Sequence, residues 1–172
     1  LLQMELPLDI SLQAAKYAQK VKKLVVMDPA PAGIIPLESY KYFDYLIPNE
    51  TEAEILVDHP VQSKEQIMDA AATLLERGVK EGVIIKLGEK GAYYLNHEDS
   101  GFIEAKKVKA VDTVAAGDAF NAGFTAHLLK GNSFQESVAM GVTIGSLAVT
   151  KSGAQESMPT LEEVDSFLNI TT

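Results

Sequence analysis

The sequence has 172 residues, of which 47% are hydrophobic, and its 24 Asp and Glu against 15 Lys and Arg give a formal net charge of −9. This length suits one domain with a sizeable core, and the acidic balance argues against a nucleic-acid partner or an anionic membrane surface. No apolar run reaches the roughly 18 residues of a membrane helix, and the absence of cysteine excludes disulfides and thiolate metal sites and suits the cytoplasm.

The first residues predict a strand. Leu1–Met4 reads as the middle of a buried strand, and the sequence lacks an initiator Met, so we expect it to be the C-terminal part of a longer protein. Apolar residues at helical spacing then predict a helix over Leu8–Lys20, with Ser11 as its N-cap. The apolar run Leu24–Met27 predicts a strand buried on both faces of a parallel sheet. Two prolines make Asp28–Gly33 a predicted loop.

The middle of the sequence alternates strands and helices. Tyr45–Ile47 predicts a short strand. The next helix runs to Val57, with Asn49 as its N-cap and Glu52 at the spacing of a capping box. A longer amphipathic helix is predicted over Ser63–Arg77.

A hairpin-like region follows. Val83–Lys86 predicts a buried strand, Leu87–Gly91 a tight turn, and Ala92–Leu95 the next strand, with Phe102–Ala105 pairing antiparallel to it. Strands that alternate with helices predict an α/β fold with a doubly wound, mostly parallel sheet and helices on both faces. With no repeat or linker, we expect one domain over residues 1–172.

The last third is mainly helical. A strand-like run around Val111 leads into a loop of small residues and an apolar helix over Ala116–Leu129. Because this helix is apolar on nearly all sides, we expect it to be central and buried. A second apolar helix is predicted over Phe134–Val149, and an amphipathic one over Leu161–Leu168 with Thr160 as its N-cap.

The start of the Ala116 helix suits an anion. Helix N-termini present unpaired N–H groups, and the small residues Ala115, Ala116 and Gly117 would let a phosphate approach that backbone. Asp118 would repel such a phosphate unless it handles a proton. An Asp in a first helical turn is also explained by capping or by the helix dipole, and the local pattern leaves both readings open.

Ligands of such sheets lie beyond the carboxyl ends of the strands. The loops expected there follow Met27, Ile47, Lys86 and Asp112. Three of them hold polar or glycine motifs, which a purely structural account does not require.

Five segments resemble, in order, the motifs of the ribokinase family of carbohydrate kinases, which includes fructokinases, minor phosphofructokinases and adenosine kinase. They are Asp28–Ala32, Pro48–Glu54, Lys86–Gly91, Asp112–Asp118 and Gly153–Pro159. The resemblance spans nearly the whole sequence and implies a ribokinase-like fold and an ATP-dependent transferase of carbohydrate metabolism that uses Mg²⁺ and K⁺. Its Ala-Ala-Gly-Asp and Gly-Ala-Gln elements favour D-ribose, phosphorylated to D-ribose 5-phosphate. A kinase for another sugar or nucleoside, and a truncated nucleotide-binding module without catalysis, remain alternatives.

The resemblance also implies roles for single residues. Asp118 is expected to be the catalytic base beside the sugar, with the N–H groups of Ala115, Ala116 and Gly117 as an anion hole. Asn49 and Glu52 are expected to organise Mg²⁺ and phosphate, Glu52 through water, a role compatible with helix capping. The residues expected to bind ATP are Lys86, Leu87, Gly88, Glu89, Lys90 and Gly91, together with Gly117 and Asp118.

A monovalent cation site and part of a sugar site are implied as well. The K⁺ ligands would be the Asp112 carboxylate, the Ser157 hydroxyl and the carbonyls of Val114, Ala148, Lys151 and Gly153. Asp112 has the alternative role of bonding loop amides. Glu5 matches an acidic residue that contacts the sugar. The family's N-terminal portion, with most sugar contacts and the lid that mediates dimerisation, is absent from this sequence, so a homodimer is expected only for the full-length protein.

Overall fold

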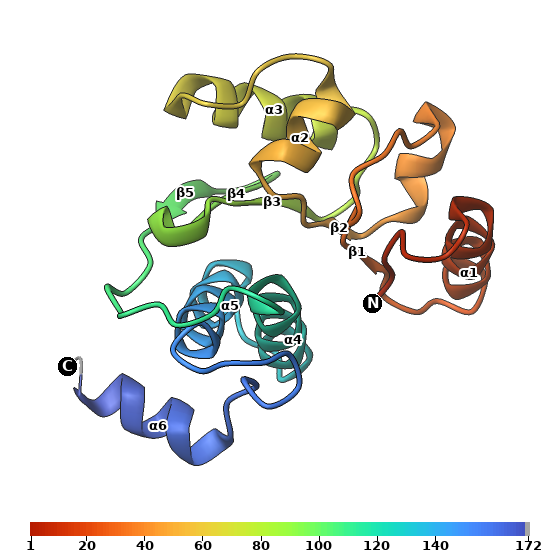
Figure 1. The fold of residues 1–172 in the computed structure, drawn as a ribbon. Helices are drawn as coiled ribbons and strands as arrows, with labels where there is room; N and C mark the ends of the chain where they lie inside the picture. The colour runs from red at the N-terminus through yellow and green to blue at the C-terminus, as the bar shows by residue number, and fades with distance from the viewer. Residues whose placement is uncertain (171–172) are drawn as a thin grey trace. The chain divides into compact units, whose positions relative to one another are not determined.

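The computed structural model describes residues 1–170, and its internal contacts divide them into two units (Figure 1). Unit 1 comprises Leu1–Leu87 and Ala92–Phe102, whereas unit 2 comprises Gly88–Gly91 and the chain from Ile103 onward. We describe each unit by itself, and the single domain expected over residues 1–172 stays a prediction.

A five-stranded sheet in the order β1-β2-β3-β4-β5 organises unit 1. Its strands are β1 (Val26–Met27), β2 (Tyr45–Leu46), β3 (Gly82–Lys86), β4 (Ala92–Asn96) and β5 (Ser100–Ile103). The first three strands are parallel, and β4 runs antiparallel to β3. Continuous apolar runs form the parallel strands, as expected for strands covered on both faces. Leu2 adds one parallel bridge to Met27, so the strand predicted at the N-terminus is reduced to a single pairing.

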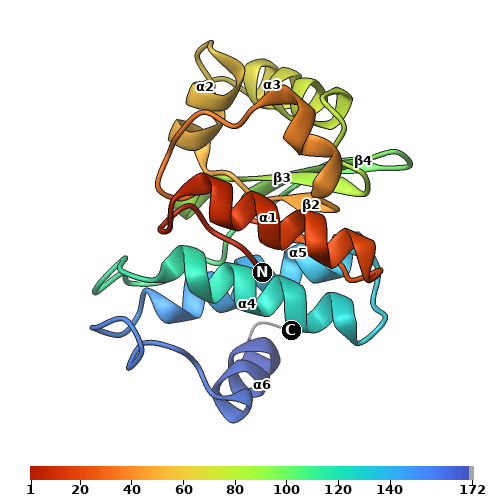
Figure 2. The same cartoon turned by 90° about the vertical axis from the view of Figure 1, so that its right-hand side faces the viewer.

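Helices cover the sheet of unit 1. They are α1 (Leu8–Lys20), η1 (Leu37–Tyr42), α2 (Glu50–Val57) and α3 (Lys64–Glu76). In Figures 1 and 2, α2 and α3 lie over the same face of the sheet. The apolar stripe of α3, which includes Ala70 and Leu74, is buried in a core shared with Leu46 and Ile85. This burial of apolar surface is the main stabilising contribution within the unit.

One predicted cap in unit 1 is wrong. The residue at the N-cap position of α1 is Pro7, which makes no side-chain capping hydrogen bond. Ser11 lies buried inside the helix. A proline suits a helix start because its missing N–H would have no partner there. Ser11 instead donates its hydroxyl to the Gln3 carbonyl at 2.7 Å, and this bond ties α1 to the first segment.

Unit 2 contains α4 (Ala116–Leu129), α5 (Phe134–Ala148) and α6 (Leu161–Ile170), together with the short η2 (Gly88–Lys90). Small residues let α4 and α5 pack closely. A Cβ added at Gly123 would lie 2.8 Å from Ile144 Cδ1, and one at Gly141 would lie 3.1 Å from the Phe120 carbonyl. The ring of Phe124 meets that of Phe134 edge-on at 6.0 Å.

Three expectations for the C-terminal third need correction. The strand predicted near Val111 does not form, and that side chain is 62% exposed, because the segment leads into a loop held by side-chain and carbonyl contacts. The strand predicted over Phe102–Ala105 instead spans Ser100–Ile103. The α4 helix is not buried on all sides: its buried residues are Ala119, Phe120, Asn121, Gly123 and Phe124, and Leu129 at its end is 71% exposed.

Candidate active site

Polar residues meet at the carboxyl ends of the three parallel strands of unit 1. Asp28 directly follows β1, Asn49 lies in the connection from β2 to α2, and Lys86 ends β3. Asn49 and Lys86 form a parallel bridge, and the Lys86 N–H donates to the Pro48 carbonyl at 2.8 Å. The predicted gathering of loops is therefore confirmed for these three. We call Asp28, Asn49, Glu52 and Lys86 the carboxyl-end cluster.

A buried ion pair lies within this cluster. Lys86 Nζ donates to Asp28 Oδ1 at 2.9 Å, and the side chains are 13% and 3% exposed. Lys86 was expected beside ATP, and the structure places its ammonium on a carboxylate of its own chain. Asp28 was not among the predicted site residues. The available signal was its position, since a carboxylate that directly follows a buried parallel strand lies at the edge where ligands bind.

Asn49 and Glu52 form the predicted capping box. The Glu52 N–H donates to Asn49 Oδ1 at 2.8 Å, while the Asn49 N–H and Nδ2 donate to the two Glu52 carboxylate oxygens at 2.7 and 2.8 Å. Glu52 is only 6% exposed. Burial raises its pKa, and the Asn49 N–H and the charge of Lys86 offset part of this rise. Capping uses two of about four lone-pair positions, so the carboxylate retains room for a metal-bound water.

The chemistry of the cluster fits Mg²⁺. This ion keeps several waters and binds proteins through one or two carboxylates plus substrate phosphates. A buried carboxylate whose pKa is raised is one that a cation would stabilise. Among residues 1–170 no group of three or more His, Asp and Glu side chains is placed to hold a metal ion. A Mg²⁺ bound mainly through phosphate needs no such group.

The predicted nucleotide loop is a tight turn. Gly88 and Gly91 both have positive φ, at 57° and 102°, and the Gly91 N–H donates to the Gly88 carbonyl at 3.1 Å. Leu87 is buried at the start of the turn, while Gly88, Glu89 and Lys90 are exposed. The exposed part of the turn is accessible to a ligand.

Glu5 lies at the same edge of unit 1. It is exposed, and the N–H of the preceding Met4 donates to the Ala30 carbonyl at 2.7 Å, which places this segment beside the proline-rich loop after β1. Glu5 therefore lies in a segment beside the loop that follows β1, and its contact with a sugar stays a prediction.

The start of α4 in unit 2 has the features of an anion site. Ala115 at the N-cap position has φ 61°, a conformation that non-glycine residues rarely adopt, and its side chain makes no capping hydrogen bond. The Ala116 N–H donates to the Thr113 carbonyl at 3.3 Å. Asp118 is exposed in the first turn. The anion hole of Ala115, Ala116 and Gly117 with Asp118 as base stays a prediction.

Asp112 connects this loop to the chain after α5. Its Oδ1 accepts the Val114 N–H and its Oδ2 accepts the Gly153 N–H, both at 3.0 Å. These bonds, the one from Val114 first, lower the pKa of Asp112. The alternative role of Asp112, bonding loop amides, is confirmed. Its remaining lone pairs leave the K⁺ site a prediction.

Of the other predicted K⁺ ligands, Lys151, Gly153 and Ser157 lie between α5 and α6, whereas Ala148 ends α5 and Val114 precedes α4. Ser157 is buried and donates its hydroxyl to the Ala154 carbonyl at 2.8 Å. The Ala148 carbonyl accepts the Lys151 N–H at 3.1 Å. Lys151 Nζ pairs with Glu163 Oε1 on α6 at 2.5 Å. The loop is thus fixed by its own bonds and by α6.

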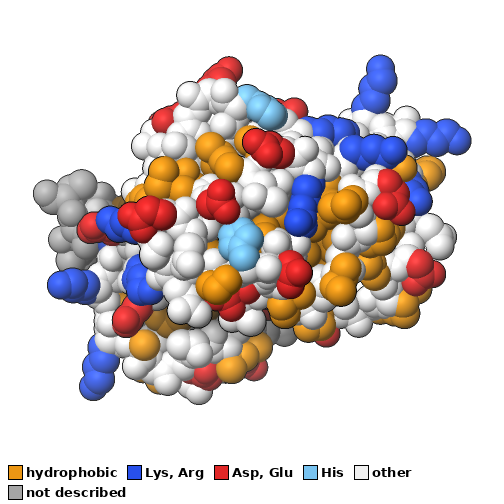
Figure 3. All heavy atoms as spheres, turned by 90° about the horizontal axis from the view of Figure 1, so that it is seen from above, with side chains coloured by type: hydrophobic (Ala, Val, Ile, Leu, Met, Phe, Trp, Pro, Cys, Tyr) orange, Lys and Arg blue, Asp and Glu red, His pale blue; other side chains and the backbone are white. Residues whose placement is uncertain are grey.

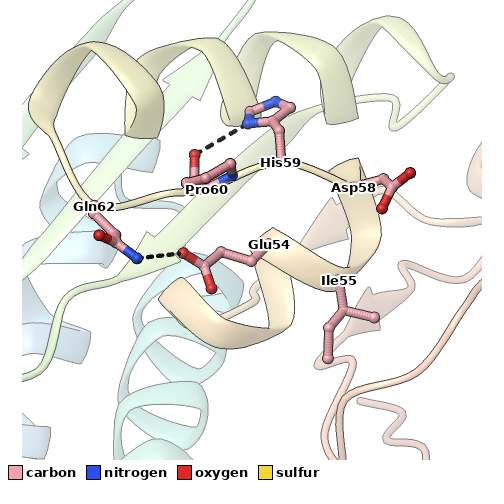
Figure 4. Close-up of a pocket in the computed structure, with 6 residues that line it drawn as sticks. All are labelled: Glu54, Ile55, Asp58, His59, Pro60 and Gln62. Carbon is pink, nitrogen blue, oxygen red and sulfur yellow. Dashed lines mark hydrogen bonds between the residues drawn. The ribbon is translucent and has the colours of Figure 1, made fainter.

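A shallow surface hollow lies elsewhere in unit 1 (Figure 4). Its lining residues are Glu54, Ile55, Asp58, His59, Pro60 and Gln62. These residues come from the end of α2 and the connection to α3, whereas the carboxyl-end cluster lies at the start of α2.

On the face that Figure 3 shows, side chains of both charges are interspersed with exposed hydrophobic ones. No described helix is long and apolar enough to cross a bilayer.

The fold and the cluster define an α/β protein whose polar loops lie at the carboxyl ends of its parallel strands. A model of the pfkB family of carbohydrate kinases matches residues 1–161, and the chain belongs to this family. The family resemblance of the five motifs is confirmed by this match.

The chain is similar to ribokinases along nearly its whole length. A ribokinase from Haemophilus influenzae is 42% identical over 168 residues, which are 98% of this chain and 55% of that protein. A deoxyribokinase from Salmonella typhi is 33% identical over 170 residues, with the same coverage of 98% and 55%. Arabidopsis thaliana ribokinase, solved with ribose and ATP, matches with a TM-score of 0.90 at 34% identity, over 96% of this chain and 54% of that one. The predicted ribokinase-like α/β fold is confirmed, and the chain spans about half the length of the curated relatives it matches.

Proposed function

We propose that this chain is the nucleotide-binding part of an ATP-dependent carbohydrate kinase that converts D-ribose to D-ribose 5-phosphate. The observation that carries the proposal is the carboxyl-end cluster, found in a chain of the pfkB family. A buried capping pair with a free carboxylate lone pair and a tight glycine turn are the parts that a Mg²⁺-nucleotide needs. The ribose preference rests on the similarity to ribokinases.

Phosphoryl transfer depends mainly on positioning and on charge stabilisation. Bound Mg²⁺ would neutralise phosphate charge, and Asn49 and Glu52 are the residues that would hold it, Glu52 through water. The turn Lys86–Gly91 would lie along ATP. The N–H groups of Ala115, Ala116 and Gly117 would receive the charge on the transferring phosphoryl group.

The acceptor side of the reaction rests on two carboxylates. Asp118 would take the proton from the attacking sugar hydroxyl onto its own carboxylate. Glu5 would contact the sugar.

A homodimer of the full-length protein is part of the same proposal, and so is a cytoplasmic location, which suits a chain without cysteine.

A second candidate is a kinase for a related sugar or nucleoside. The 33% identity to a deoxyribokinase over 98% of the chain favours it specifically. A nucleotide-binding module without catalysis is the third reading, because the chain spans about half of its relatives.

The test is an assay of ATP-dependent phosphorylation with ribose, deoxyribose, fructose and adenosine. It uses this chain and, where the genome encodes one, the longer polypeptide that contains it. Turnover of ribose above the other acceptors is expected. Preference for another acceptor would favour the second candidate, whereas nucleotide binding without any turnover in the longer polypeptide would favour the third.

A monovalent cation is expected to support this activity. Replacing K⁺ by a non-coordinating organic cation at constant ionic strength should depress turnover, because the ion would hold the loop of Asp112 and Gly153 beside α4. Turnover that is indifferent to the replacement would remove the K⁺ site from the proposal.

A further inference from the structure

An ion pair joins α6 to the segment that follows α5. Lys151 Nζ donates to Glu163 Oε1 at 2.5 Å, and the two side chains are 32% and 39% exposed. The helix that carries Glu163 is anchored in unit 2, because the neighbouring Val164 is only 6% exposed. Lys106, from the segment before α4, also lies over the Phe167 ring of α6 at 5.1 Å. Glu163 therefore stands on an element that packs on the rest of its unit.

Glu163 also caps its own helix. Its Oε2 accepts the Thr160 N–H at 2.7 Å, and its N–H donates to the Thr160 hydroxyl at 3.3 Å, so Thr160 is the N-cap as predicted. These bonds form a capping box, in which Gln can replace Glu because both side chains offer an acceptor oxygen. One carboxylate oxygen of Glu163 thus caps α6 while the other binds Lys151.

The residues on either side of Lys151 bond to Asp112. The Val149 carbonyl accepts the Asp112 N–H at 3.2 Å, and the Gly153 N–H donates to Asp112 Oδ2 at 3.0 Å. Asp112 Oδ1 in turn accepts the Val114 N–H at 3.0 Å, just before α4. All of these residues belong to unit 2. A continuous set of contacts therefore leads from α6 through Lys151 to the loop before α4.

The effect expected of the ion pair is local. Partly exposed ion pairs contribute little to the free energy of unfolding, because both charges stay hydrated and the side chains lose conformational freedom. The pair nevertheless restricts Lys151, whose neighbours bond to Asp112. We therefore expect it to limit opening of this loop more than unfolding of the whole chain.

We propose that Glu163 is a positioning residue, which through Lys151 holds the segment after α5 against Asp112 and so orders the loop before α4. This inference rests on the proposed function, in which that loop receives phosphoryl charge and K⁺ binds beside it. Three of the proposed K⁺ ligands, the Asp112 carboxylate and the carbonyls of Lys151 and Gly153, lie on the two segments that these contacts join. Without the Glu163 charge, the segments separate more often, and the cation has to order them when it binds.

Glu163→Gln removes the ion pair and keeps the acceptor of the capping box. Amide hydrogen exchange, followed by nuclear magnetic resonance, is expected to become about threefold or more faster at the N–H groups of Asp112 and Gly153. Glu162→Gln is the matched control, because it removes the same charge from an exposed residue in the same helical turn. Exchange in the control should equal that of the wild type. Wild-type exchange in Glu163→Gln would overturn the inference.

A second measurement separates positioning from a merely structural role. The Tm is measured with a non-hydrolysable ATP analogue, in K⁺ and in tetramethylammonium at equal ionic strength. The rise in Tm that K⁺ gives over the organic cation reports K⁺ binding to the folded chain. In Glu163→Gln this rise should be smaller, with K⁺ binding weakened by about the same factor of three, whereas Glu162→Gln should keep the wild-type rise. A merely structural ion pair would lower the Tm equally in both salts and leave the rise unchanged.

The outcomes distinguish this inference from the proposed function. An unchanged rise in Glu163→Gln, beside a clear rise in the wild type, would overturn the positioning role and leave the proposed K⁺ site standing. A wild-type chain without any rise in K⁺ would overturn both the K⁺ site and the role of Glu163. Faster loop exchange together with a reduced rise in Glu163→Gln alone would support the inference.

Discussion

At the scale of residues, Glu52 and Asp112 each have a structural role and also retain the capacity to bind a further group. Glu52 caps α2 through Asn49 and is also a buried charge beside Lys86. Asp112 bonds two loop amides and keeps lone pairs for another partner. A structural role for such a residue therefore does not argue against a chemical one.

Asp118→Asn is expected to reduce turnover by at least about a hundredfold in the longer polypeptide, since general base catalysis contributes roughly 10²–10⁴-fold. Nucleotide affinity, measured by calorimetry, should change little because the amide keeps the size of the side chain. Asp165→Asn, which neutralises an exposed carboxylate on α6, is the control. Near-normal turnover of Asp118→Asn would remove Asp118 from the mechanism.

The free energy of unfolding should carry a pH dependence that arises from Glu52. Burial raises the pKa of its carboxyl above 4.5, and Asp28 adds to the rise. The folded protein therefore holds this proton more tightly than the unfolded chain does. The stability that Glu52 contributes is present below its unfolded pKa and is lost as pH rises through its folded pKa. Urea denaturation between about pH 4 and pH 8 should show wild type losing stability relative to Glu52→Gln as pH increases. A difference that is constant over this range would contradict the raised pKa.

At the scale of elements, capping boxes and glycine turns fix where helices and loops begin. The helices α2, α3 and α5 each begin with a capping box, at Asn49, Ser63 and Ser133. The turn after β3 depends instead on glycine, because Gly91 has φ 102° and an added Cβ would lie 1.9 Å from the Ile103 carbonyl.

Gly91→Ala should therefore lower the free energy of unfolding by more than the about 1–2 kcal/mol that a left-handed residue alone costs. The backbone of the following segment would have to move to relieve the clash. Gly131→Ala is the matched control, since Gly131 also has positive φ but its added Cβ would meet nothing within 4 Å. If urea denaturation shows the same loss of unfolding free energy in both variants, the clash at Gly91 is relieved without cost.

At the scale of the whole molecule, the carboxyl-end cluster lies in unit 1, whereas Gly88–Gly91 and the segment with Asp118 belong to unit 2, and the chain spans about half the length of its relatives. We expect this chain to bind the ATP analogue but to transfer phosphate at least about tenfold more slowly than a polypeptide of the relatives' length, because an acceptor site open to water favours side reactions. Single-turnover assays of both would measure the ratio. Equal rates would show that these residues suffice for catalysis.

The elements could be predicted from the sequence because their signals are local. The bounds of α1 agree with the prediction, α3 differs by one residue at each end, and the capping box of Asn49 and Glu52 is as expected. Periodicity and capping act over a few residues, so neither needs the rest of the chain. The strand expected near Val111 failed for the same reason, since apolar residues alone do not show that a neighbouring strand is available to pair.

The tertiary structure decided what depends on pairing across the sheet. Asp28 and Lys86 are 58 residues apart, and only the parallel register of β1, β2 and β3 brings their side chains to 2.9 Å. The same register places Asn49 beside Lys86. From the sequence, Lys86 was expected to be one of the residues that bind ATP. In the structure its charge is already balanced by Asp28, because burial of a lone ammonium would cost far more than burial of a pair.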